Sequence, residues 1–393
     1  MKINIYKKTI CIIITALLIA SNVLICYSKE EILPPGSNGV HPMFQLRSDE
    51  ERQAISDDII NFDELPLIVH DYNPEVRNSW NNYETNKYSN DITDSYLNAA
   101  ENFDSMSSEA ASSAQEAMFE AQSYAMQMNA DNNVSDSLTN YYSCSMLEAN
   151  VLLNTRKLFI NYYKTKLAHD ITVLSEFEAA REYTSAENKY SLGAITKVEA
   201  LNAKVDYLTK QSETIVALST YNQTKQNLLV ALGKDYKSDT VIISPFPLID
   251  FNIVLVTNPE TDKDEAIKNN FQYKIYQRNL NNSQTDSVKS KYQLLVNNAE
   301  EFIRADIETK FRTLKDSINS LMLSQQKAIA AEDDFNKISK EYKLGSVSKR
   351  EYTTSEYKKD VAQKTAQIAY YDFAIIYYNY LAAVDGLASA GAG

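Results

Sequence analysis

The chain has 393 residues and a formal net charge of −13 at neutral pH. This acidic balance argues against nucleic acid or an anionic lipid surface as a partner. Only eight glycines and eight prolines occur, and residues 75–244 and 260–393 contain no proline. Long proline-free stretches rich in Ala, Leu, Lys, Glu, Gln and Asn predict long helices and a mainly α-helical fold.

Residues 1–28 have the pattern of an export signal peptide. Three lysines precede an uncharged run from Thr9 to Cys26, and we expect cleavage near Ser28. Two alternatives remain open, because residues 23–26 resemble a lipobox and the uncharged run is almost long enough for an uncleaved membrane anchor. All three alternatives predict an exported protein. No later segment has the length and apolarity of a transmembrane helix.

The first half of the chain predicts a polar leader followed by helices. Residues 29–62 form the leader, and we expect helix to begin between about Asp63 and Asn73. Asn73 and Pro74 then have the pattern of a helix cap followed by proline in the first turn. Further helix is expected over residues 99–130, with a turn at residues 129–137.

A long helix over residues 147–189 then ends at Leu192-Gly193, since glycine favours the backbone conformation of a helix end. A return helix is expected from Lys197 to about Leu232. Its apolar residues recur at alternating spacings of three and four, as in a coiled-coil seam formed by Val198, Leu201, Val205, Leu208 and Ile215.

The second half repeats this order after a linker that reads as two short strands, at residues 240–247 and 251–257. Helix restarts near Asp264, turns near Asn297-Asn298 and ends at Leu344-Gly345. The return helix that follows has its own apolar seam, formed by Tyr357, Val361, Ile368, Tyr371, Ile375 and Tyr378.

The two halves are related by a constant shift. Tyr190-Ser-Leu-Gly-Ala-Ile-Thr-Lys-Val-Glu199 recurs 152 residues later as Tyr342-Lys-Leu-Gly-Ser-Val-Ser-Lys-Arg-Glu351. A shift held over about forty residues indicates an internal duplication. The predicted organisation is a signal peptide at 1–28, a polar leader at 29–62, one repeat at 63–237, a linker at 238–262, a second repeat at 263–387 and a tail at 388–393.

These motifs, in this order and twice over, resemble the TolC-like outer-membrane efflux proteins. The resemblance covers about residues 63–387 and implies a homotrimer whose long helices form an α-barrel duct. It further implies a component of a tripartite efflux or secretion system. The implied partners are a periplasmic adaptor (membrane fusion) protein and an inner-membrane pump, and the implied location is the outer membrane, the periplasm or another part of the extracytoplasmic cell envelope.

The resemblance also implies a role for the paired turns. In that family the glycine-containing turns form the far tip of the duct, where the hairpin of the adaptor protein docks. By position, the docking residues are Leu192, Gly193 and Thr196 in the first half and Leu344, Gly345 and Ser348 in the second. Glu351 takes the place of one acid of the ring that narrows the duct entrance. The second acidic position is Thr354, so half of this constriction carries over.

One family feature is not expected here. Family members insert a pair of membrane strands between the ascending and descending helices of each half. Only 72 residues separate Asn270 from Tyr342, compared with 117 between Asn73 and Tyr190. The second half therefore has no room for two strands of about ten residues and their turn. We predict that the membrane β-barrel strands are missing or reduced, with strands forming less than about a tenth of the chain.

No enzymatic, metal or cofactor site is predicted. His41, His70 and His169 lack the spacing of metal ligands, and no phosphate-binding loop or nucleophile elbow occurs. If the signal peptide is removed, Cys144 is the only cysteine and an internal disulfide is excluded. The five tyrosines between residues 370 and 380 indicate either a helix-packing core or an interface between protomers.

Two functions from different classes remain. The first is a trimeric transport duct with no chemistry of its own. The second is a helical scaffold of the cell envelope, derived from the TolC fold without its barrel, that binds an adaptor or a wall-associated partner.

Overall fold

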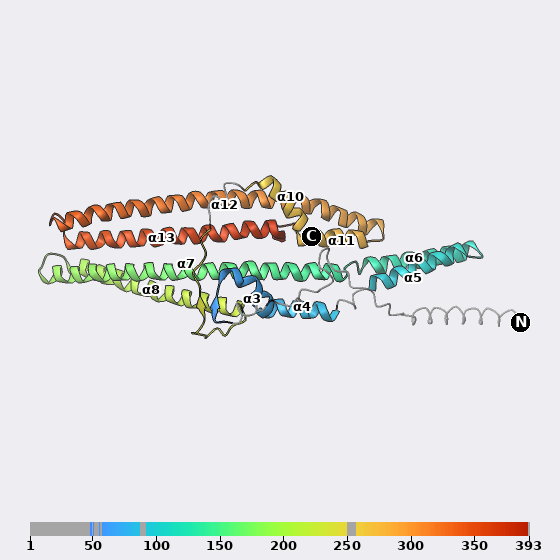
Figure 1. The fold of residues 1–393 in the computed structure, drawn as a ribbon, viewed down its shortest axis with the longest axis horizontal. Coiled ribbons are helices and arrows are strands. Elements are labelled where there is room, and N and C mark those ends of the chain that lie inside the picture. The colour runs from blue at the N-terminus through green and yellow to red at the C-terminus, as the bar shows by residue number, and fades with distance from the viewer. Residues whose placement is uncertain are drawn as a thin grey trace. The chain divides into compact units, whose positions relative to one another are not determined.

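The computed structural model describes residues 48, 50, 55, 57–86, 92–249 and 257–391. The predicted signal peptide, most of the polar leader and nearly all of the predicted strand at 251–257 lie outside these residues. The described part of the chain is mainly helical with minor β structure, as predicted (Figure 1). None of its helices is both long enough and apolar enough to cross a membrane.

The described elements follow one another in this order: β1 (Ile59–Ile60), η2 (Phe62–Glu64), α3 (Leu65–Tyr72), α4 (Pro74–Asn86), α5 (Ile92–Ser108), α6 (Ser113–Asp131), α7 (Ser137–Ser191), α8 (Lys197–Ala231), β2 (Ile242–Ile243), α10 (Pro259–Asn269), α11 (Phe271–Asn282), α12 (Asp286–Lys343), α13 (Lys349–Ala382) and η3 (Ala383–Leu387). The two short strands pair in parallel, with Ile59 opposite Ile242. They are the only strands within the described residues.

Four long helices form the larger of two compact units, which takes in Met43–Asn81, Tyr142–Lys274 and Leu295–Gly393. The helices lie side by side in the order α12, α13, α7, α8 (Figure 1). Stacked tyrosine rings join α12 to α13 and α7 to α8. For example, Tyr183 of α7 stacks on Tyr207 of α8 with ring centroids 6.0 Å apart. The long helix of the first half thus packs against the return helix of the second.

Ion pairs and hydrogen bonds join the two central helices, α7 and α13. Lys364 Nζ lies 3.0 Å from Asp170 Oδ2, and Lys164 Nζ lies 2.5 Å from Asp372 Oδ1. Thr354 donates to Glu178 over 2.9 Å. These pairs are partly exposed, so we expect each to contribute about 1 kcal/mol or less and to fix the register of the two helices more than their stability.

The two predicted apolar seams have different surroundings. In α13, Tyr357 hydrogen-bonds to Ser175 of α7 over 3.1 Å, and Tyr371 stacks on Tyr163 with ring centroids 5.9 Å apart. The α13 seam therefore packs inside the chain. In α8, by contrast, all five seam residues are about half exposed or more, with Val198 at 64% and Ile215 at 65%.

The main hydrophobic core lies where β1, α3, α7, α8 and α13 converge with the segment after β2. Phe62 is at its centre, with its ring 5.3 Å from that of Phe159 and 4.9 Å from that of Phe246. Tyr163 donates hydrogen bonds to two carbonyls of the β2 segment, at 2.8 and 2.7 Å. The tyrosines between residues 370 and 380 belong to this core and its continuation along α13, which agrees with the packing alternative.

In each half, a buried asparagine makes the same set of hydrogen bonds at the end of the long helices away from the glycine-containing turns. Asn73, which is 6% exposed, accepts hydrogen bonds from the first turn of α4 and donates to the carbonyl of Ala231 over 2.7 Å. Asn270, which is 1% exposed, caps α11 through Tyr273 N and donates to the carbonyl of Ala388 over 2.8 Å. One buried asparagine therefore caps a restarting helix and holds the end of a return helix.

The smaller compact unit is built from Asn82–Tyr141 and Ile275–Leu294. The helices α5 and α6 form a hairpin in it (Figure 1). Residues 88–155, which include this hairpin, contain no lysine or arginine. Asp136 accepts from Arg278 over 2.6 Å and from Asn282 over 3.1 Å, which joins the two segments of the unit.

The prediction of a turn near Asn297-Asn298 was wrong. Asn297 and Asn298 lie inside α12, and the turn is at residues 283–285. Asparagine in a helix costs under about 1 kcal/mol, whereas Asp131 accepts from the backbone N–H groups of Gln284 and Thr285 at 2.6 and 2.9 Å. Asp131 thereby holds the two residues that directly precede α12 and fixes where this helix begins.

The helix predicted over residues 99–130 is divided in the structure into two helices, α5 and α6. Ser112 breaks it by capping α6 through the backbone N–H of Gln115, a role that serine performs well. The helix predicted over 147–189 begins ten residues earlier, at Ser137. The return helix predicted from Lys197 to about Leu232 is confirmed as α8.

Candidate functional site

The two glycine-containing turns have the same backbone structure. In the first, Gly193 N donates to Tyr190 O over 2.9 Å and Ala194 N donates to Lys189 O over 2.8 Å. In the second, Gly345 N and Ser346 N make the equivalent bonds, both at 2.9 Å. This pair of bonds is the Schellman motif, which requires a left-handed residue, and the two glycines have φ of +71° and +73°.

Both turns present an exposed leucine. Leu192 is 83% exposed and Leu344 is 80% exposed, although each precedes a rigidly hydrogen-bonded glycine. No atom lies within 4 Å of where a Cβ would be at either glycine. The two turns lie at the same end of the long helices (Figure 1). Two apolar side chains therefore project from the turns into open space.

The residues after the turns cap the return helices. Thr196 accepts from Glu199 N over 3.3 Å, and Glu199 accepts from Thr196 N over 2.7 Å, which completes a capping box. These hydrogen bonds lower the pKa of the Glu199 carboxyl. Ser348 likewise accepts from Glu351 N over 3.2 Å. Glu351 is exposed and lines an open groove between α12 and α13, so its side chain is free to contact a ligand.

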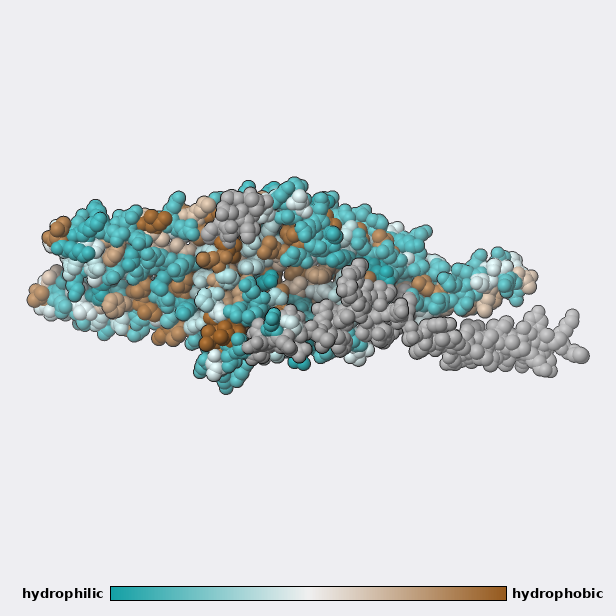
Figure 2. Space-filling model, viewed as in Figure 1, coloured by the Kyte–Doolittle hydropathy of each residue, from teal (hydrophilic) through white to brown (hydrophobic). Residues whose placement is uncertain are grey.

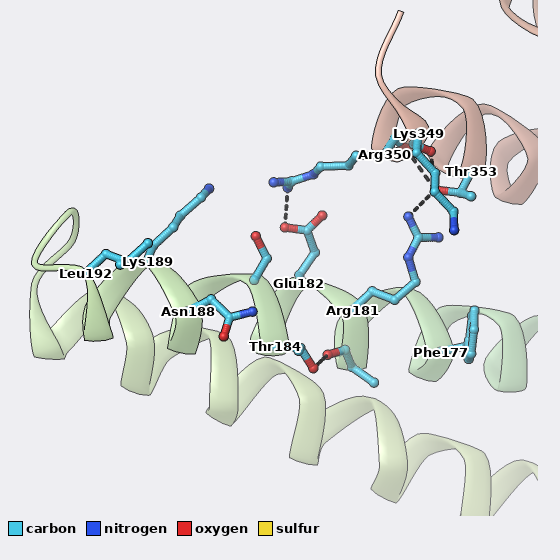
Figure 3. A pocket seen from close by; sticks show the side chains of 12 residues that line it. Phe177, Arg181, Glu182, Thr184, Asn188, Lys189, Leu192, Lys349, Arg350 and Thr353 are labelled. Carbon is cyan, nitrogen blue, oxygen red and sulfur yellow. Dashed lines mark hydrogen bonds and ion pairs between the residues drawn. The ribbon is translucent and has the colours of Figure 1, made fainter. Parts of the chain in front are cut away.

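A groove of about 970 Å³ lies between α7 and α13 next to the first turn (Figure 3). We call it the tip groove. Its lining includes the cationic residues Arg181, Lys189, Lys349 and Arg350, one acid, Glu182, and the apolar residues Phe177, Ala180 and Leu192.

Two contacts cross the tip groove. Arg350 of α13 forms an ion pair with Glu182 of α7, and Arg181 of α7 donates to Thr353 of α13. The four side chains point toward one another between the helices (Figure 3). Sequence reasoning missed these residues, because the partners are 168 and 172 positions apart and the side chains themselves are polar.

No group of three His, Cys, Asp or Glu side chains in the described residues could hold a metal ion. His70 Nδ1 lies 2.8 Å from Glu148 Oε1, and Trp80 donates to the other oxygen of Glu148 over 2.7 Å. Burial raises the pKa of the Cys144 thiol. Its Sγ accepts a hydrogen bond from Ser79 Oγ over 3.1 Å. These contacts join α3 and α4 to α7, so His70, Glu148 and Cys144 have structural roles in helix packing.

Comparison with known proteins gives matches of structure and none of sequence. Neither a family model nor a curated protein matches the chain. CusC, a channel-forming protein, matches with a TM-score of 0.57 and 9% identity over 90% of this chain and 98% of its own. A membrane protein from Pseudomonas aeruginosa matches with a TM-score of 0.56 and 10% identity over 82% and 92%.

The outer membrane channel CmeC of Campylobacter jejuni also matches, with a TM-score of 0.50 and 12% identity over 84% of this chain and 87% of CmeC. At these identities the comparison establishes the fold alone. The duplicated helical hairpins are thus of the kind found in outer membrane channels. The chain has the TolC-like fold, as predicted from its paired turns and its duplication.

Proposed function

We propose that the chain is a duct component of a tripartite efflux or secretion system in the cell envelope. Three copies form the duct, and the paired turns dock a periplasmic adaptor protein that works with an inner-membrane pump. The chain carries its export signal at residues 1–28 and is organised in the two repeats 63–237 and 263–387. It supplies a passage and docking surfaces, and no chemistry of its own.

The observation that carries the proposal is the apolar outer face of α8. The shift of 152 residues relates Val198, Leu201 and Val205 of α8 to Arg350, Thr353 and Tyr357 of α13. All three of those α13 residues contact α7 within the chain, through an ion pair and two hydrogen bonds. The exposed α8 residues therefore occupy positions that form a helix interface in the other half.

The duplication also identifies the partner of this face. In the second half, α12 corresponds to α7, so α8 of one copy is suited to pack against α12 of the next. Apolar patches are visible over both outer helices of the layer (Figure 2). Exposed residues of α12 include Phe302, Met322, Leu323 and Ile329. A contact between two different faces of identical chains generates a ring when the rotation closes.

The ring is tested by sedimentation equilibrium of the purified chain at micromolar concentration. We expect three chains per particle, and Val198→Glu with Val205→Glu should give monomers because two charges would be buried at the contact. Leu248→Glu is the matched control, since Leu248 is 90% exposed and is not part of α8. A wild-type monomer at this concentration would rule out the closed ring.

The docking role of Leu192, Gly193, Thr196, Leu344, Gly345 and Ser348 is tested at the two glycines. Valine at both positions strains each turn by roughly 1 kcal/mol, because φ is positive, while the absence of neighbours prevents a clash. Helicity should stay near normal and binding of the cognate adaptor should weaken. Full adaptor recovery by the Gly193→Val and Gly345→Val double variant would exclude docking at the turns.

We further propose that Glu351 narrows the duct entrance. Three copies around an axis would bring like charges together, so cations should bind there and reduce the current. In planar-bilayer recordings, Glu351→Gln should lose block by divalent cations. Block that persists in this variant would assign the constriction to other residues.

A second candidate is an envelope scaffold that binds an adaptor or a wall-associated partner. It is favoured by the helical α5–α6 hairpin in the first half and by the three-residue connection between α11 and α12 in the second. These elements occupy the places between the ascending and descending helices of each half. A soluble trimer that binds the adaptor without producing any conductance in lipid bilayers would favour the scaffold over the duct.

A further inference from the structure

We propose that the tip groove binds an acidic helical segment of the docking partner. The partner would present carboxylates to the lysines of the groove and an apolar side chain to its ends. This inference rests on the proposed docking function and adds the chemistry of the partner to it.

Charge pairing inside the tip groove is incomplete. Arg350 is paired with Glu182, and Arg181 Nη1 lies 2.8 Å from Glu178 Oε2. Lys189 and Lys349 form no ion pair with any residue that the structure describes. Two positive charges thus face an open groove without a counter-charge. A carboxylate brought near either lysine would be attracted to it, whereas a cation would be repelled.

The positive charge is local and extends from the groove onto the second turn. Residues 337–351 contain five basic and two acidic residues, in a chain of net charge −13. Around the first turn the charges in the sequence are equal in number, because Glu187 and Glu199 accompany Lys189 and Lys197, but neither acid forms an ion pair with Lys189 in the described residues. A basic patch on an acidic protein steers acidic partners to that place and repels them elsewhere.

The groove also has an apolar part that suits a protein rather than a free anion. Phe177 of α7, which is 65% exposed, and Leu192, which directly follows α7, both line the groove. Leu192 is fifteen positions after Phe177, a separation of about 22 Å along a helix. Figure 3 shows the two side chains at opposite ends of the groove, with the charged residues between them. A partner helix of about four turns with acids at its centre and an apolar residue near an end matches this arrangement.

Two synthetic helical-hairpin peptides test the proposal on the full-length chain. They share the same apolar residues and differ in having glutamate or lysine at the outward positions. Fluorescence anisotropy should detect binding of the glutamate hairpin only. The double reversal Lys189→Glu with Lys349→Glu should raise its Kd by about tenfold or more, and added salt should do the same.

A matched pair of reversals provides the control. Lys268 and Lys289 are exposed and form no ion pair in the described residues, and neither lines the groove. Lys268→Glu with Lys289→Glu should leave the Kd within twofold. Circular dichroism of both double variants checks that helicity is unchanged.

Several outcomes would overturn the proposal. These are equal binding of both hairpins, binding of neither, and a Kd that the groove reversals do not change. Displacement of the glutamate hairpin by short single-stranded DNA at equal concentration would also overturn it, because the groove would then be a general anion site. A further outcome would separate this proposal from the proposed docking at the turns. If both hairpins bind equally and the Gly193→Val and Gly345→Val double variant binds neither, the proposal of an acidic partner is refuted and the proposal of docking at the turns is supported.

Discussion

Replacement of Asn270 by alanine should be among the most destabilising single changes in the larger compact unit. Asn270 is 1% exposed and serves two helix ends at once. Loss of its cap on α11 costs about 1 kcal/mol. The carbonyl of Ala388, which is also buried, would lose its donor, and an unpaired buried acceptor costs about 1–3 kcal/mol. The expected loss of unfolding free energy is therefore about 2–4 kcal/mol.

Urea unfolding followed by helical circular dichroism measures this loss. At a slope of about 3 kcal/mol per molar, the midpoint should fall by roughly 1 M. Asn298→Ala is the control, because Asn298 is exposed inside α12 and alanine is the better helix former there. Its midpoint should stay the same or rise slightly.

The aspartate variant separates the two roles. Asn270→Asp keeps an acceptor for the α11 cap, but an ionised carboxylate cannot donate to Ala388 O and would be buried. Its destabilisation should be larger at pH 8 than at pH 4, where a protonated carboxyl can donate. If Asn270→Ala shifts the midpoint no more than Asn298→Ala does, then the hydrogen bonds of Asn270 to α11 and to Ala388 do not stabilise the fold, contrary to this prediction.

Three further predictions concern other parts of the chain. Gly193→Ala should lower the free energy of unfolding by about 1 kcal/mol, because φ is positive there and nothing clashes with the new Cβ. Gly233→Ala should lower it by at least about twice as much, because its Cβ would lie 2.3 Å from Tyr72 O. Equal urea midpoints for the two variants would contradict this. Burial raises the pKa of Tyr163 to about 12, so the stability that it provides should be complete below pH 10 and lost as pH rises toward 12. Tyr163→Phe should lower stability at pH 8 by about 1–2 kcal/mol and make the alkaline loss in a urea-midpoint series shallower. The pKa of Glu199 is lowered in the folded chain, so its capping box should contribute fully above the ordinary pKa and be lost as pH falls through the lowered pKa. Hydrogen exchange at the start of α8 should therefore rise in acid for the wild type. In Glu199→Gln it should be independent of pH once it is corrected for intrinsic rates.

Much of the fold could be predicted because its signals are local. A glycine after a long proline-free helix predicts a left-handed helix end, and both Gly193 and Gly345 have that conformation. Thr196 and Asn73 have the chemistry of helix caps, and both act as caps. Each of these features depends on a few neighbouring residues, so no knowledge of the distant chain was needed.

The features that were missed depend on contacts between distant residues. The start of α12 is fixed by Asp131, more than 150 positions away, so the local sequence suggested the wrong asparagines as the turn. The pairing of α7 with α13 uses polar residues such as Glu182 and Arg350, which read as solvent-exposed faces. For the same reason the tip groove could not be predicted, although the two turns beside it could.

The absence of lysine and arginine from residues 88–155 has a practical consequence for mapping this protein. Trypsin has no site in this stretch, so a digest yields one very long peptide that carries α5, α6 and the beginning of α7. Amine-directed crosslinkers have no reactive side chain there and will instead report mainly on lysine-rich regions such as residues 337–349. Carboxylate-directed crosslinkers and cleavage after aspartate or glutamate would be needed to follow the α5–α6 hairpin.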